Sequence, residues 1–295
     1  MADAFGSGGG PGHGHGTTIL TATSGSLDEA RIRAGLRDDP FVTRLIVLES
    51  TDSTNDAVRR MARCGARAGT AVVADRQTTG RGRLGRSWHS AAGLGLYVSV
   101  LLRPRDAEQP VTRWTLAAAV AACEACREVA DGAVRIEWPN DLMWERKKLG
   151  GLLTETRCAS GEDSELVVGL GVNVAHRSSD FPAAIAARAT SLVLAGTAGA
   201  VPSRERLAAA YLRRLGRVAA ALEAGDWTSI ARRWEALAWG ARGQRVRVRT
   251  QGSHPRLVAQ GVTDGIAFDG ALRVLLDQGG SIEVRDSDAV DPLEG

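Results

Sequence analysis

The chain has 295 residues, of which 44% are hydrophobic and 24% charged, and its formal net charge at pH 7 is +3. This composition is typical of a globular protein with a substantial core and excludes a wholly disordered chain. No apolar run reaches the roughly 18 residues that a membrane-spanning helix needs, so no membrane association is expected. The small net charge excludes a protein that coats nucleic acid through charge alone.

Residues 1–26 are predicted to form a disordered tail because they are rich in Gly, Ser, Thr and His. They lack the basic start and apolar stretch of a secretion signal, so we expect a cytoplasmic protein. His13 and His15 allow weak metal binding as an alternative use of the tail. A helix-turn-helix module needs roughly 50 to 60 ordered residues, which this segment does not offer, so no DNA partner is expected.

Hydrophobic periodicity predicts an alternation of strands and helices over 27–240. A short helix is expected at 27–36, and further helices after Ser53 or Thr54 as N-cap, with Gly65 at the end, and at 112–129, 204–222 and 227–239. Strands are expected at 45–48, 70–74, 94–102, 134–138 and 142–144, and an antiparallel pair at 149–156 and 166–174. This order predicts an α+β domain with a mixed β-sheet flanked by helices.

Two side-chain patterns on these helices admit a ligand site or a simple packing role. Trp227, Ile230, Trp234 and Leu237 fall on one helical stripe, and we interpret that stripe as core. Cys123 and Cys126 have a spacing seen in redox and zinc sites, but no second pair or histidine partner stands at ligand spacing. We interpret both thiols as small apolar side chains on an alanine-rich helix.

The pattern changes after residue 240. Short alternating strands are expected at 246–248, 261–268, 272–276 and 281–284, separated by Gly and Asp turns. We predict that 241–295 forms a small SH3-like β-barrel.

A loop rich in glycine and arginine is the strongest chemical feature. It runs Arg76-Gln-Thr-Thr-Gly80-Arg81-Gly82-Arg83-Leu84-Gly85-Arg86-Ser87-Trp88 and has no acidic residue. Four arginines repel one another unless an anion neutralises them, and glycine lets backbone N–H groups approach phosphate oxygens. The loop therefore favours a polyphosphate or an adenylate as ligand, with a solvated basic loop as the alternative.

The segment from Gly80 to Trp88 resembles the signature Gly-Arg-Gly-Arg-x-Gly-Arg-x-Trp of the biotin protein ligases at every fixed position. Three further segments agree with that family in order and spacing: Asp52-Ser-Thr-Asn55, Trp138-Pro-Asn-Asp141 followed by Lys148-Leu-Gly-Gly151, and Gly169-Leu-Gly-Val-Asn173. The resemblance covers 41–295. It implies a class II synthetase-like catalytic domain with an SH3-like barrel, of the monofunctional type without an N-terminal DNA-binding domain.

The resemblance also implies an activity. Biotin would be activated by ATP and Mg²⁺ to biotinyl-5'-AMP with release of pyrophosphate, then transferred to a lysine of a carrier protein. The carrier would be the biotin carboxyl carrier domain of a carboxylase, and a homodimer is a further possibility that the family suggests.

Biotin has a polar ureido ring, an apolar body and a carboxylate, so its site needs short polar groups at one end. For Ser53 and Thr54, helix capping is the alternative role. By resemblance the biotin site comprises Ser53, Thr54, Asn55, Gln77, Arg81, Gly82, Arg83, Lys148 and Gly151. The implied ATP site comprises Arg83, Arg86, Trp88, Asn140 and Asn173, while metal ligands stay unassigned. Lys148 and Arg83 are the expected catalytic residues, and the arginine loop is expected to order on ligand binding.

One position departs from the family pattern. Glu137 stands before Trp138 where the family usually has lysine, which removes a positive charge near the reacting phosphate. A catalytically weakened biotin-binding homologue is therefore one alternative, and a lipoate or octanoate ligase of the same fold is another. A non-catalytic sensor of biotinyl-AMP is disfavoured by the missing DNA-binding module. No histidine base stands out in the motifs, and His89 in the loop is a weak candidate.

Overall fold

A computed structural model describes residues 26–37, 39–130, 133–157, 164–196, 202–250 and 256–293. Its strands form a seven-stranded sheet, order β1-β2-β3-β7-β6-β5-β4, and a five-stranded sheet, order β11-β10-β9-β8-β12. The predicted tail, with His13 and His15, lies outside the described residues apart from Ser26. Within the described residues no helix is long and apolar enough to span a membrane.

The seven-stranded sheet is mixed, as predicted. β1 and β2 pair in parallel, and every other neighbouring pair in this sheet is antiparallel, including the predicted pair β6 and β7. The strands are β1 (Arg44–Thr51), β2 (Thr70–Gln77), β3 (Gly95–Leu102), β4 (Arg135–Glu137), β5 (Asp141–Trp144), β6 (Lys147–Arg157) and β7 (Glu165–Asn173).

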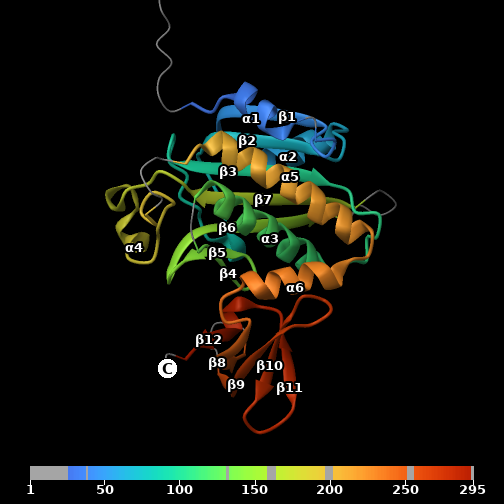
Figure 1. The fold of residues 1–295 in the computed structure, drawn as a ribbon, viewed down its shortest axis with the longest axis vertical. Coiled ribbons are helices and arrows are strands. Elements are labelled where there is room, and N and C mark those ends of the chain that lie inside the picture. Colours follow the sequence, from blue (N-terminus) through green and yellow to red (C-terminus); the bar gives the residue numbers. More distant parts are fainter. Residues whose placement is uncertain are drawn as a thin grey trace, which may run out of the picture.

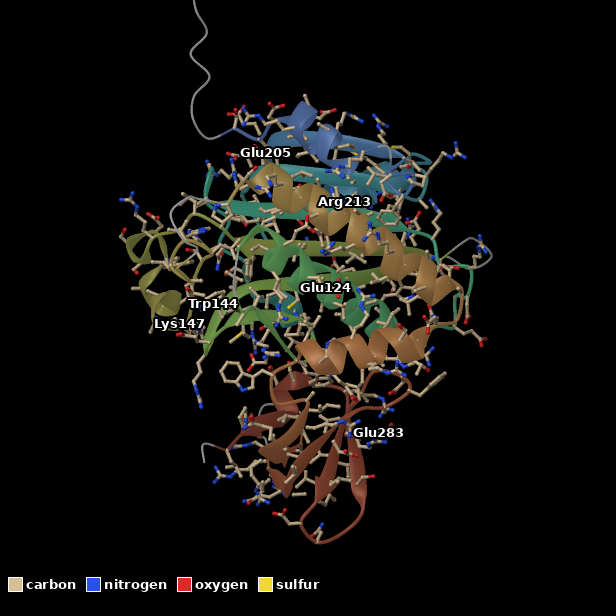
Figure 2. All side chains as sticks on the ribbon, in the orientation of Figure 1. Glu124, Trp144, Lys147, Glu205, Arg213 and Glu283 are labelled. Carbon is tan, nitrogen blue, oxygen red and sulfur yellow. The ribbon has the colours of Figure 1, made fainter. Side chains whose placement is uncertain are left out.

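Most helices cover one face of this sheet (Figure 1). The covering helices are α1 (Glu29–Leu36), α3 (Val111–Val129), α5 (Arg204–Glu223) and α6 (Trp227–Leu237), and their apolar side chains join alternate residues of the strands in one core. Glu124 on α3 receives ion pairs from Arg214 of α5 and Arg233 of α6, which ties the three helices together (Figure 2). On β7, Val168, Leu170 and Val172 point into this core.

The opposite face of the sheet carries less cover, and this difference positions the site. α2 (Thr54–Arg63) packs there in a smaller cluster with Val72, Leu101 and Val167, from β2, β3 and β7. Because side chains alternate along a strand, Gly169, Gly171 and the end of β7 also face this side. The short helix α4 (Ala183–Ala186), which the sequence pattern did not predict, lies in the segment after β7.

Two helix predictions concerned packing, and both agree with the structure. Cys123 and Cys126 are free and buried on α3, and burial raises the pKa of the Cys123 thiol to about 11. Trp227, Ile230 and Trp234 are buried in the core, so the aromatic stripe of α6 is confirmed as a packing surface. The predicted end of α6 at Trp239 was wrong, because the backbone turns extended at Ala238, which bridges to Ile136 of β4.

The C-terminal strands form one antiparallel sheet, consistent with the predicted SH3-like unit. They are β8 (Arg242–Arg249), β9 (Leu257–Ile266), β10 (Leu272–Leu276), β11 (Ser281–Val284) and β12 (Val290–Pro292), the last not predicted. The β9–β10 turn contacts α3 and the β4–β5 turn, since Arg113 Nε donates to the Phe268 carbonyl at 2.7 Å and Trp138 Nε1 to that of Gly270 at 3.1 Å. A domain boundary near residue 241 stays a prediction, because both sheets contribute to one core cluster.

Candidate active site

A cavity of about 750 Å³ lies over the thinly covered face of the large sheet. Side chains from α2, the arginine loop, the β4–β7 strands, the segment after β7 and the C-terminal sheet line it. All residues predicted for the site contribute to this lining: Ser53, Thr54, Asn55, Gln77, Arg81, Gly82, Arg83, Arg86, Trp88, Asn140, Lys148, Gly151 and Asn173. The structure thus brings four sequence motifs, far apart in the chain, to one hollow.

Two glycines of β7 make the floor of the cavity. A Cβ added at Gly169 would lie 2.2 Å from Asn55 Oδ1, and one at Gly171 would lie 2.6 Å from Trp88 Nε1. No side chain other than hydrogen fits at either position without displacing Asn55 or Trp88. Asn173 follows on the same face, and its Nδ2 donates to the Thr190 carbonyl at 2.9 Å. The spacing of the Gly-Leu-Gly-Val-Asn motif therefore follows from the alternation of a strand.

Buried polar groups gather at the end of the cavity near α2. Thr54 donates from its backbone N–H and its hydroxyl to Gln77 Oε1, at 2.8 and 3.1 Å. Ser99 Oγ lies 2.7 Å from Thr54 Oγ1 and 2.6 Å from Asn55 Oδ1. Ser99 was not predicted as a site residue, although a serine within the apolar run of β3 was a signal for it.

Ser53 occupies the N-cap position of α2 but its side chain makes no capping hydrogen bond. The backbone at Ser53 is extended, as at other N-caps, and the residue is buried. Capping by the hydroxyl, the alternative role, is therefore absent here, and the hydroxyl stays available beside the cavity.

Arg81 is neutralised by acids from outside its loop. It forms a bidentate pair with Asp56 of α2 and lies 3.5 Å from Glu155 Oε2 of β6, and these carboxylates raise the pKa of Arg81. Glu155 also accepts from Asn55 Nδ2 at 2.7 Å and pairs with Arg59. The network links the arginine loop to the polar end of the cavity.

Arg83 and Arg86 of the loop reach toward the residues between β11 and β12. Arg86 pairs with Asp288 at 2.8 Å, and Arg83 Nη1 donates to Asn140 Oδ1 at 3.1 Å and to Ser287 Oγ at 3.4 Å. The loop is expected to need an anion to neutralise its repulsion, and two carboxylates from elsewhere in the chain, Asp56 and Asp288, supply that charge for Arg81 and Arg86. Among the described residues Arg83 has no acidic partner.

Lys148 projects into the middle of the cavity. Its Nζ lies 2.5 Å from Asp141 Oδ2 and 5.8 Å from the centre of the Trp88 ring. Gly151 pairs with Gly171 on one neighbouring strand and with Asp141 on the other, so the backbone beside Lys148 is continuous with the cavity floor. Glu137 lines the same wall, where desolvation by the surrounding protein and the Asp141 carboxylate raise the pKa of Glu137, and Lys148 opposes that shift.

The segment after β7 closes another side of the cavity, and sequence patterns missed it. Phe181, Ile185, Arg188 and Ala189 line the cavity, and Lys148 N donates to the Arg188 carbonyl at 2.8 Å. His89 also lines the cavity, with its Nε2 3.1 Å from the Asp180 carbonyl.

His176 packs against Phe181 of this segment. It is fully buried, stacks on Phe181 with ring centres 4.9 Å apart, and neither ring nitrogen has a hydrogen-bond partner among the described residues. Burial lowers the pKa of His176 to about 4, and the nearby His89 adds to this shift.

Comparison with known proteins shows which family the chain belongs to. Residues 47–173 match the biotin/lipoate A/B protein ligase family. A biotin--[acetyl-CoA-carboxylase] ligase from Mycobacterium tuberculosis is 32% identical over 247 residues, which cover 80% of this chain and 84% of that protein. The chain belongs to the biotin/lipoate A/B protein ligase family.

Other relatives differ in how much of their length is matched. The bifunctional ligase/repressor BirA of Bacillus subtilis is 39% identical over 173 residues, which cover 59% of this chain and 53% of BirA. The chain thus spans about half the length of this relative. A biotin protein ligase from Aquifex aeolicus, solved in complex with biotin and ATP, has a TM-score of 0.70 at 29% identity, covering 86% of this chain and 100% of that one.

The family match contains every predicted site residue, because all of them lie between Ser53 and Asn173. The C-terminal residues Ser287 and Asp288, which contact the arginine loop, lie outside the matched range. Membership of this family does not by itself separate biotin from lipoate as substrate, so the residues of the cavity must supply that distinction.

Proposed function

We propose that the protein activates biotin with ATP to form biotinyl-5'-AMP and pyrophosphate, then transfers biotin to a lysine of a biotin carboxyl carrier domain. One observation carries the proposal: Lys148 stands in a single cavity between a buried polar end and an arginine loop. The relative named biotin--[acetyl-CoA-carboxylase] ligase and the Aquifex aeolicus complex with biotin and ATP support this choice of substrates and carrier.

The polar end near α2 suits the ureido ring of biotin. The ring offers one acceptor and two donors, and Ser53, Asn55 and Gln77 supply short groups of both kinds there. Asn55 is held by bonds to Ser99 and Glu155, and Gln77 by bonds to Thr54 and Ser90, so little ordering of these two side chains is left for the moment of binding. The biotin body would then lie over Gly169 and Gly171, with its carboxylate toward Lys148.

Adenylation brings together two anions, the carboxylate of biotin and the α-phosphate of ATP. Lys148 and Arg83 are positioned to offset their repulsion and the charge that develops at phosphorus. Arg83 is bonded here to two neutral groups, so a phosphate can displace these contacts at lower cost than it could displace a carboxylate. Arg86, Trp88, Asn140 and Asn173 would hold the nucleotide portion.

Mg²⁺ would accompany the ATP. Within the described residues no group of three His, Cys, Asp or Glu side chains could hold a metal ion by itself. This fits an ion that enters bound to the phosphates, since Mg²⁺ commonly keeps most of its ligands as water and phosphate oxygens. When bound, the ion would neutralise phosphate charge and favour departure of pyrophosphate.

The arginine loop would retain the adenylate. A mixed anhydride hydrolyses in water and acylates amines without selection, so an enzyme that forms one must keep it enclosed. The loop is tied on one side by Arg81 to Asp56 and on the other by Arg86 to Asp288, and Arg83 lies between these ties. We infer that Arg83 closes over the intermediate until the carrier arrives.

Incubation with ATP and Mg²⁺ plus either biotin or lipoate tests the proposed function. We expect biotin-dependent exchange of labelled pyrophosphate into ATP, and at least about tenfold slower exchange with lipoate, which has no ureido ring to satisfy the polar end. Equal or faster exchange with lipoate would support the lipoate ligase alternative. Binding of biotin without any exchange would support the weakened homologue. A homodimer, a cytoplasmic location and the monofunctional type stay predictions.

A further inference from the structure

Glu137 lines the cavity at the end of a short strand. It ends β4, the edge strand of the large sheet, and pairs in register with Asp141, which pairs with Gly151, which pairs with Gly171. Paired residues share a face, so Glu137 lies in line with the cavity floor. Neighbouring strands are roughly 4.8 Å apart, which places Glu137 one strand beyond the Asp141 that holds Lys148.

The Glu137 carboxylate is also not engaged by any other described side chain. Glu137 and Asp141 are the two carboxylates that line the cavity among the described residues. Asp141 Oδ2 is engaged by Lys148, whereas the Glu137 side chain has no hydrogen bond or ion pair to any other described residue. Its side chain is exposed to the solvent of the cavity, so it can exchange protons with water.

The second half-reaction needs such a group. A carrier lysine arrives as an ammonium ion, because its pKa is roughly 10.4, and only the neutral amine attacks an acyl carbon. His89, the histidine that lines the cavity, is held by the Asp180 carbonyl on another side of it. Building on the function proposed above, we propose that the Glu137 carboxylate is the general base that deprotonates the carrier lysine.

The Glu137 carboxylate takes one proton from the lysine ammonium, and the nitrogen lone pair then forms a bond to the acyl carbon of biotinyl-AMP. The bond from that carbon to the phosphate oxygen breaks, and AMP leaves with the electron pair. The nitrogen loses a second proton to solvent as the amide forms, and Glu137 returns its proton to the water of the cavity.

The surroundings of Glu137 suit this role. Desolvation by the neighbouring protein atoms and the Asp141 carboxylate raise the pKa of its carboxyl, and Lys148 opposes the shift. A carboxylate with a raised pKa accepts a proton more readily. Asp141 from β5 and Lys148 from β6 are the charged groups that face it from the neighbouring strands.

The same charge has the opposite effect on adenylation. A carboxylate near the reacting phosphate repels it, so Glu137→Gln removes an obstacle in the first half-reaction while removing the base from the second. We therefore expect pyrophosphate exchange at or above the wild-type rate. Transfer from supplied biotinyl-AMP to a purified biotin carboxyl carrier domain should slow about 100-fold at pH 7, the usual contribution of a general base. A purely structural defect would slow both reactions.

Three further measurements sharpen the test. Hydroxylamine is already neutral at pH 7, so Glu137→Gln should consume biotinyl-AMP with hydroxylamine at the wild-type rate. Raising the pH toward the pKa of lysine should recover most of the lost transfer, and Glu137→Asp should restore part of it at pH 7. Glu145→Gln is the matched control, because Glu145 lies in the turn between β5 and β6, whose residues Trp144 and Lys147 are labelled in Figure 2, and it does not line the main cavity.

The outcomes separate the two proposals. Failure of the wild-type protein to make biotinyl-AMP would overturn the proposed function itself. Normal adenylation together with carrier transfer by Glu137→Gln within about threefold of wild type would overturn the role of Glu137 alone. Equal losses with the carrier and with hydroxylamine would also overturn it, since hydroxylamine needs no base.

Discussion

A single methyl group added to the cavity floor provides a quantitative test of how the polar end is built. Gly169→Ala places a Cβ 2.2 Å from Asn55 Oδ1, far closer than real contacts allow, and β7 is a central strand that cannot retreat. Asn55 must therefore move, and with it the bonds from Ser99 Oγ at 2.6 Å and to Glu155 Oε2 at 2.7 Å.

The size of the effect follows from these two bonds. A neutral hydrogen bond contributes about 1 kcal/mol and one to a charged group about 1.5–3 kcal/mol. If about 2–3 kcal/mol of this is lost from the bound state, the Kd for biotin rises about 30- to 140-fold, because each 1.4 kcal/mol is a factor of ten. Ser53 and Gln77 at the same end should be displaced less than Asn55, because they contact Gly169 only indirectly.

Isothermal titration calorimetry with biotin measures this change directly. Val168→Ala is the matched control, because Val168 is the neighbouring residue but points into the helix-covered core. That variant should lose about 2 kcal/mol of unfolding free energy and keep the wild-type Kd. Biotin binding by Gly169→Ala within threefold of wild type would refute the reasoning that the glycine exists to seat Asn55.

Three further predictions follow from the same structure. Lys148→Met should slow biotin-dependent pyrophosphate exchange about 100- to 1,000-fold because it removes the cation between the two anions, and a loss below tenfold would contradict its assigned role. Arg83→Gly should release biotinyl-AMP, seen as biotin on bystander proteins in a streptavidin blot, whereas unchanged selectivity would argue against retention by this loop. The folded-state pKa of His176, about 4, lies below its unfolded value of roughly 6.5, so the unfolded chain binds more protons between these values and stability falls as pH drops. When the pH falls from 6.5 to 4, the unfolding free energy of the wild type should drop by up to about 3 kcal/mol more than that of His176→Gln, as measured by urea titration. Equal drops in the two proteins would contradict this account.

Local patterns in the sequence predicted the elements that build the cavity. The segment 166–174 was predicted as a strand and forms β7, and the spacing of Gly169, Gly171 and Asn173 on that strand places all three on one face. The apolar stripe on α6 predicted its buried face, including Trp234. These features depend on periods of two or 3.6 residues, which a sequence displays directly.

Long-range contacts could not be predicted in the same way. The partners of Arg81 and Arg86 are Asp56, Glu155 and Asp288, the last about 200 positions away in the chain. No periodic pattern encodes such pairs, so the loop's charge looked uncompensated. The short helix α4 and strand β12 have four and three residues, too few to display a period.

The nucleotide that the protein retains provides the most direct test of the account. The protein would be incubated with biotin, lipoate, ATP and Mg²⁺ together, separated from free ligands by gel filtration, and denatured for mass spectrometry. The account predicts that biotinyl-AMP is released from the protein fraction, because the polar end selects biotin and the arginine loop holds the product. Recovery of lipoyl-AMP, or of no adenylate at all, would contradict it.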